Sequence, residues 1–138
     1  LRAFRARGGK LVMYHGWSDA AIPGQNAIDY YQAVAAAMGA PATESFVRLF
    51  MVPGMQHCAG GNGATAFGQN DVATGDPEHN ISAALERWVE QGTAPQQIIA
   101  SKLSGTTVIR TRPLCAYPKT AHYKGAGSTD DAANFECR

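Results

Sequence analysis

The stretch SFVRLFMVPGMQHCAGGNG, residues 45–63, joins a nearly continuous apolar run to a glycine-rich loop in which His57 and Cys58 are adjacent. Such a run is typical of a β-strand covered on both faces, as in a parallel sheet. Pro53 and Gly54 predict the end of the strand, and the loop follows directly. Since α/β proteins carry their chemistry at the carboxyl ends of parallel strands, this stretch predicts an α/β fold and a candidate site at His57.

The residues before this stretch predict a matching strand and a connecting helix. KLVMYHGWSD, residues 10–19, is a short apolar run that ends in a turn, as expected of a strand. Residues 23–39 have apolar positions at helical spacing, with Pro23 placed to begin a helix and Gly39 to end it. Pro41 is expected to stop the helix from continuing.

The residues after this stretch predict a second helix and a β tail. Residues 76–92 form the helix, with Asp76 or Asn80 as its N-cap. Residues 96–114 predict a hairpin that turns at Ser104 and Gly105. The expected apolar stripe of the helix consists of Ile81, Ala84, Leu85, Trp88 and Val89. The alternation of strands and helices predicts an α/β fold with a parallel sheet, covering helices and a short β tail.

Composition excludes some classes of partner. The chain has 138 residues, 12 Lys plus Arg against 11 Asp plus Glu, and a formal net charge of +1. This balance predicts neither nucleic acid nor an anionic membrane as partner. No apolar stretch approaches the ~18 residues of a membrane span. The opening residues resemble the end of a helix without an initiator Met, so we expect the chain to be part of a longer protein.

Three cysteines predict one disulfide and one thiol left over. Cys115 and Cys137 bracket a polar, glycine-rich terminal loop that has little apolar surface to hold it. A disulfide closing a loop of that size contributes roughly 3 kcal/mol in the chain-entropy model. A structural disulfide indicates an oxidising compartment, so we expect a secreted or periplasmic protein. Cys58 has no partner in this prediction.

Asp19 and His57 each follow a predicted strand, so neighbouring parallel strands would bring them to one edge of the sheet. An aspartate that orients a histidine forms two thirds of a Ser-His-Asp triad. In α/β-hydrolases the serine precedes the aspartate, but the chain has no G-x-S-x-G, and Ser18 directly adjoins Asp19. The nucleophile is therefore expected outside this chain. His15 is a rival base, for which we predict a structural role with a bond to the backbone.

GWSDAAIPG and VPGMQHCAGG together resemble the C-terminal half of the tannase and feruloyl esterase family of α/β-hydrolases. The resemblance implies that Asp19 is the acid of the triad and His57 its base. It also implies that Cys58 forms a disulfide with a cysteine beside the catalytic serine, outside this chain. Members hydrolyse esters of aromatic acids such as gallate and ferulate, and a terephthalate monoester is also a known substrate.

The resemblance extends over nearly the whole chain and implies a domain assignment. Residues 1–138 are expected to be the C-terminal part of one α/β-hydrolase catalytic domain. The half that bears the nucleophile, the oxyanion-hole donors and a calcium-binding lid domain would lie outside the chain. We therefore expect no cofactor or metal in this chain and no activity from it alone. Its partners would be a small aromatic ester and the N-terminal part of the same protein.

Two other functions remain open on the residues alone. One is a serine exopeptidase of the same fold, which would not need Cys58 bridged to a residue beside the serine. The other is a truncated, non-catalytic copy that acts as a binding or structural domain. In either case an isolated chain would expose apolar strand surface, so we expect it to be poorly soluble or oligomeric.

Overall fold

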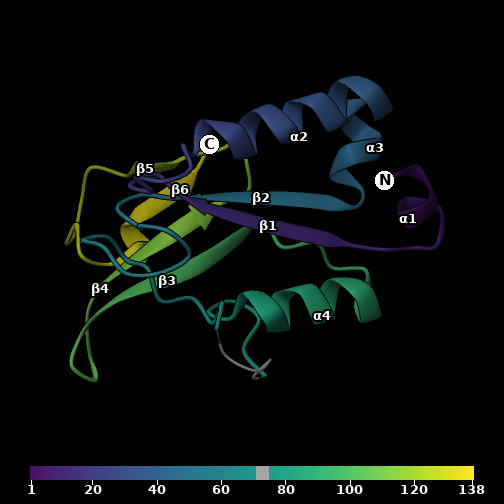
Figure 1. Cartoon of the computed structure of the whole chain (residues 1–138). Helices are drawn as coiled ribbons and strands as arrows, with labels where there is room; N and C mark the ends of the chain where they lie inside the picture. Colours follow the sequence, from purple (N-terminus) through teal and green to yellow (C-terminus); the bar gives the residue numbers. More distant parts are fainter. Residues whose placement is uncertain (71–74) are drawn as a thin grey trace.

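The centre of the molecule is a pair of parallel strands (Figure 1). The computed structural model describes residues 1–70 and 75–138. β1 (Leu11–Gly16) and β2 (Val47–Val52) run side by side over their full lengths. The predicted parallel neighbours are therefore present, and both strands end at the same edge.

The pairing register fixes which loops meet at that edge. Leu11 pairs with Val47 at one end and Gly16 with Val52 at the other. α2 (Gln25–Met38) makes the crossover between the two strands, as predicted. The loops that follow Gly16 and Val52 therefore begin level with each other.

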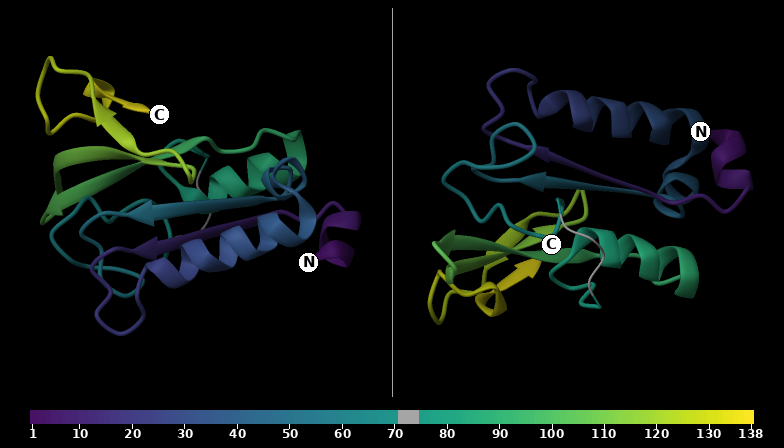
Figure 2. Two further views of the ribbon diagram at one scale, coloured as in Figure 1. Left: turned by 90° about the horizontal axis from the view of Figure 1, so that it is seen from above. Right: turned by 60° about the horizontal axis from the view of Figure 1, so that its bottom comes forward.

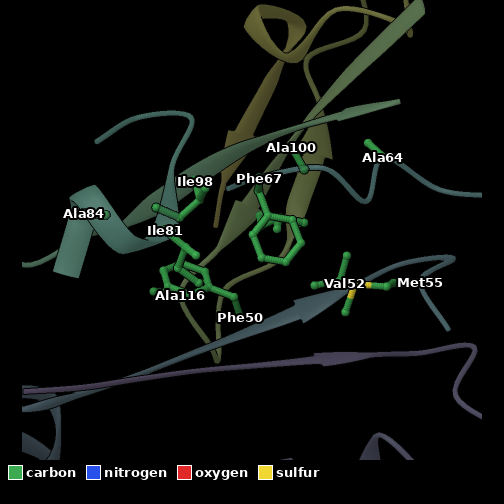
Figure 3. Close-up of a cluster of buried hydrophobic side chains, with 11 residues drawn as sticks. Phe50, Val52, Met55, Ala64, Phe67, Ile81, Ala84, Ile98, Ala100 and Ala116 are labelled. Atoms are coloured by element: carbon green, nitrogen blue, oxygen red, sulfur yellow. The ribbon is translucent and has the colours of Figure 1, made fainter. Parts of the chain in front are cut away.

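Helices cover both faces of the strand pair. Figures 1 and 2 show α2 on one face and α4 (Ile81–Gln91) on the other. On the α2 face, Val47 and Leu49 pack with Ile28, Tyr31 and Val34. On the other face, Figure 3 shows a cluster that includes Phe50, Val52, Phe67, Ile81 and Ile98. Alternate residues of β2 thus enter two different cores, which explains its nearly continuous apolar sequence.

The helices confirm the end of α2 before Pro41 and Asn80 as one of the two predicted N-caps, and they differ from the prediction in the short helix α3 and in the exposure of Val89. Pro41 ends α2 but lies in the first turn of another short helix, α3 (Ala40–Glu44), where the missing N–H of proline costs no hydrogen bond. In α4 the N-cap is Asn80, whose side-chain oxygen accepts from the N–H of Ala83 at 2.9 Å. Val89, expected in the buried stripe, is 60% exposed, because the buried face of α4 is turned toward Ala83.

The C-terminal third forms the predicted β tail beside the strand pair. β3 (Gln97–Ser104) and β4 (Thr107–Cys115) form an antiparallel hairpin that turns at Gly105. A disulfide joins Cys115 to Cys137, as predicted, and closes the terminal segment.

The remaining short elements are α1 (Arg2–Ala6), β5 (Ala121–Tyr123), the 3₁₀ helix η1 (Ala132–Asn134) and β6 (Phe135–Cys137), which pairs with β5.

Candidate active site

The loops after β1 and β2 approach each other closely at Gly16. A Cβ placed on Gly16 would lie 2.3 Å from the carbonyl oxygen of Met55 and 2.4 Å from that of Gln56. The N–H of Ser18 donates to the carbonyl of Met55 at 2.9 Å, which joins the two loops. Glycine is required here because no side chain fits between the strand end and the loop that carries His57.

Asp19 and His57 meet across this junction. Nδ1 of His57 lies 2.7 Å from Oδ2 of Asp19, although the two residues are 38 positions apart. A carboxylate only accepts, so Nδ1 carries the hydrogen and donates it. In the neutral imidazole, Nε2 then holds the lone pair. The His57 side chain is 59% exposed and that of Asp19 is 2% exposed, so the imidazole is accessible and the carboxylate is covered.

The loop that follows Asp19 holds its carboxylate in the ionised form. Oδ1 accepts from the N–H of Ala21 at 2.9 Å and from the N–H of Ile22 at 3.0 Å. The Ile22 bond, the Ala21 bond and the His57 contact lower the pKa of Asp19 to about 2, against burial, which raises it. Asp19 is therefore a fixed negative charge whose Oδ2 accepts the hydrogen of Nδ1 of His57. Sequence reasoning named Asp19 but missed these donors, which an Asx turn would have suggested.

His15 lies beside this pair and not in place of it. Its Nε2 is 2.9 Å from the carbonyl oxygen of Ile22 and 3.4 Å from Oδ2 of Asp19. The predicted bond to the backbone is present. Because Nε2 is occupied by these contacts and the side chain is only 17% exposed, His57 is the better placed base.

Cys58 has a strained backbone next to His57. Its φ is +62°, and the N–H of Ala59 donates to the carbonyl of His57 at 2.8 Å, which is the pattern of a γ-turn. A non-glycine residue rarely adopts this conformation without a compensating constraint. The thiol is exposed and free among the described residues. The thiol next to His57 is therefore accessible from outside.

The other histidines do not join this site. His79 bonds Asp76 in a separate surface turn, and His122 bonds the hydroxyl of Thr120. Within residues 1–70 and 75–138, no group of three or more His, Cys, Asp or Glu side chains could hold a metal ion. In the same residues, no helix has the length and apolarity needed to cross a membrane.

Comparisons with known proteins show what this chain is similar to. The family model described as tannase and feruloyl esterase matches residues 1–138. The chain is 48% identical to a mono(2-hydroxyethyl) terephthalate hydrolase of Piscinibacter sakaiensis over 99% of its own length and 21% of that protein. It is 44% identical to an uncharacterized esterase of Xanthomonas campestris pv. campestris, over 99% of this chain and 27% of that one.

A solved structure gives the same result for the fold. The crystal structure of feruloyl esterase B from Aspergillus oryzae superposes with a TM-score of 0.90 at 40% identity. The match covers 99% of this chain and 28% of that one. It confirms the predicted α/β-hydrolase fold class. The chain thus spans about a quarter of the length of the relatives that it matches.

Proposed function

Because the chain belongs to the tannase and feruloyl esterase family, we propose that it supplies the acid and base of a Ser-His-Asp carboxylic ester hydrolase. One observation carries the proposal: the hydrogen bond between His57 and Asp19 at the ends of two parallel strands. The serine is proposed to come from outside residues 1–138, as the C-terminal part of a single catalytic domain would require.

The proposed mechanism assigns one task to each nitrogen of His57. Nε2 accepts the serine proton as the serine oxygen forms a bond to the ester carbonyl carbon. The same nitrogen then gives the proton to the alcohol oxygen as the ester bond breaks. In the second half, Nε2 takes a proton from water, which attacks the acyl-enzyme, and returns it to the serine. Nδ1 keeps its hydrogen on Asp19 throughout, and Asp19 stays ionised because its pKa is about 2.

The proposed substrates are esters of aromatic acids. Support comes from the relatives named for feruloyl and terephthalate esters. No cofactor is assigned to this chain, and calcium binding would belong to a lid domain outside it. Secretion or export to the periplasm is supported by the Cys115–Cys137 disulfide.

The proposed role of Cys58 is a disulfide to a cysteine next to the nucleophile. Its exposed thiol and its turn beside His57 support this role, since such a bond would tie the base to the serine. Peptide mapping of the non-reduced full-length protein should find Cys58 in a mixed peptide with the serine segment. A free Cys58 would favour the exopeptidase of the same fold instead.

The decisive experiment replaces the two aspartates that hold histidines. Asp19→Asn in the full-length protein should lower turnover of an aromatic ester by about 10⁴, as loss of the orienting acid does in serine proteases. Asp76→Asn is the matched control, because Asp76 bonds His79 at the same 2.7 Å on the surface. A loss of less than tenfold for Asp19→Asn, or equal losses for both variants, would contradict the proposal.

A further inference from the structure

His15 contacts the candidate site, but it has no role in the proposed assignment of Asp19 as acid and His57 as base. It lies on β1 four residues before Asp19, and its Nε2 contacts both the loop and the carboxylate. We propose that His15 is a positioning residue, which holds Asp19 in the orientation that His57 needs. The inference rests on the proposed esterase function and adds a third residue to its machinery.

The bond to Ile22 fixes which nitrogen of His15 carries the hydrogen. A backbone carbonyl only accepts, so the 2.9 Å contact requires an N–H at Nε2 of His15. The neutral ring therefore has the Nε2–H tautomer, the opposite of the one assigned to His57. His15 acts as a hydrogen-bond donor here, and its Nε2 is not available as a base.

This donor is linked to the carboxylate through two consecutive hydrogen bonds. Asp19 accepts from the N–H of Ile22, and Ile22 in turn accepts from His15 through its carbonyl. Ile22 is thus bonded to Asp19 through its N–H and to His15 of β1 through its carbonyl. Without His15, only the N–H groups of the loop itself and His57 would orient the carboxylate.

Nε2 of His15 also lies near the carboxylate oxygen that binds His57. Nε2 of His15 is 3.4 Å from Oδ2 of Asp19, longer than a normal hydrogen bond but close enough for the N–H dipole to act. Oδ2 therefore lies between Nδ1 of His57 at 2.7 Å and Nε2 of His15. The arrangement limits rotation of the Asp19 carboxylate and keeps its shorter bond to His57 intact.

Two substitutions of His15 distinguish the effect of losing the N–H donor from the effect of losing the volume of the ring. His15→Gln keeps an N–H donor near the position of Nε2, whereas His15→Phe keeps a ring and removes the donor. His79→Phe is the control, because His79 bonds Asp76 away from the site. In the full-length esterase, His15→Phe should lower kcat by about tenfold with little change in KM, since a small misplacement of a reacting group costs up to about 10².

The conservative variant provides the test of mechanism. His15→Gln should recover most of the lost kcat, while His79→Phe should match the wild type. Recovery by Gln would not be expected if the ring only filled space. Unchanged kcat in His15→Phe, or equal losses in Gln and Phe at equal melting temperature, would overturn the inference.

Nuclear magnetic resonance supplies a readout that does not depend on activity or on a folded variant. Long-range ¹H–¹⁵N spectra of the wild-type protein at neutral pH should show hydrogen on Nε2 of His15 and on Nδ1 of His57. Hydrogen on Nδ1 of His15, with none on Nε2, would overturn the inference. If Asp19→Asn abolishes turnover and His15→Phe does not, the positioning role fails alone; if neither changes turnover, the proposed function fails as well.

Discussion

Among the residues that the structure describes, two aspartate–histidine pairs have the same short bond and very different surroundings. Nδ1 of His57 lies 2.7 Å from Asp19, and Nδ1 of His79 lies 2.7 Å from Asp76. The first pair joins residues 38 positions apart, and the second joins residues three apart in one turn. The bond length therefore does not tell a candidate active site from a surface turn.

Burial and chain topology separate the two pairs. The Asp19 side chain is 2% exposed and that of Asp76 is 58% exposed. Both carboxylates accept backbone N–H groups, which lower the pKa of each below its usual value. Only Asp19 is fixed at the end of a strand, against a loop from the neighbouring strand. A covered acid with an exposed histidine is what a triad needs, because the acid stays fixed while the base meets substrate.

Apart from the loss of the Asp19 carboxylate itself, the largest effect on this contrast is expected from a methyl group at Gly16. Gly16→Ala would place Cβ 2.3 Å from the carbonyl oxygen of Met55 and force the two loops apart. Overpacking of this kind costs about 1–3 kcal/mol of stability. Misplacing His57 by about 1 Å should lower kcat by about 10². Esterase kinetics and thermal unfolding of the full-length variant measure both effects.

Gly75→Ala is the matched control for that experiment. Gly75 precedes Asp76, and a Cβ there meets nothing within 4 Å. Its activity and melting temperature should equal those of the wild type, since the turn of Asp76 and His79 needs no close approach. Equal effects of the two alanines would show that the Gly16 junction does not hold the site.

A second, smaller difference should appear in the pH dependence of stability. The pKa of Asp19 is lowered to about 2 in the folded chain, against about 3.9 for an unfolded aspartate. A lowered folded-state pKa stabilises the fold above the unfolded value, and this contribution is lost as pH falls from about 5 toward 2. Asp19→Asn should therefore flatten the fall in unfolding free energy over that range.

Urea unfolding at several pH values between 5 and 3 measures this slope. Asp76→Asn should flatten it less, because the pKa of Asp76 is lowered on an exposed side chain. An unchanged slope in Asp19→Asn would mean that the carboxylate is not held by its donors. Above about pH 4, any acid-side loss of esterase activity must come from a group other than Asp19, which is already ionised there.

The difference between the two pairs also shows which features of the candidate site can be predicted from the sequence. The apolar runs of β1 and β2 and the loop after each of them predicted that Asp19 and His57 lie at one edge, because strand order and strand ends are visible in the amino-acid sequence. The sequence also predicted that His15 bonds the backbone, but not that the bond goes to Ile22 or that Nε2 of His15 lies 3.4 Å from Oδ2 of Asp19, since both depend on how the loop after Asp19 folds back. The exposure of Val89 was missed for a related reason. Helical spacing defines a stripe but not how far the helix is rotated on the sheet.

The smallest effect concerns the helix that follows the surface pair. Asn80 caps α4 through its bond to the N–H of Ala83, and it is buried. Asn80→Ala should cost about 1 kcal/mol of stability, as loss of an N-cap does. Asp76→Ala removes the bond to His79 and the bond from the N–H of Glu78, both exposed. It should lower the melting temperature less than Asn80→Ala does, with no change in activity for either variant. A larger loss for Asp76→Ala would mean that this pair also holds the helix entry, and that exposure alone does not separate it from Asp19 and His57.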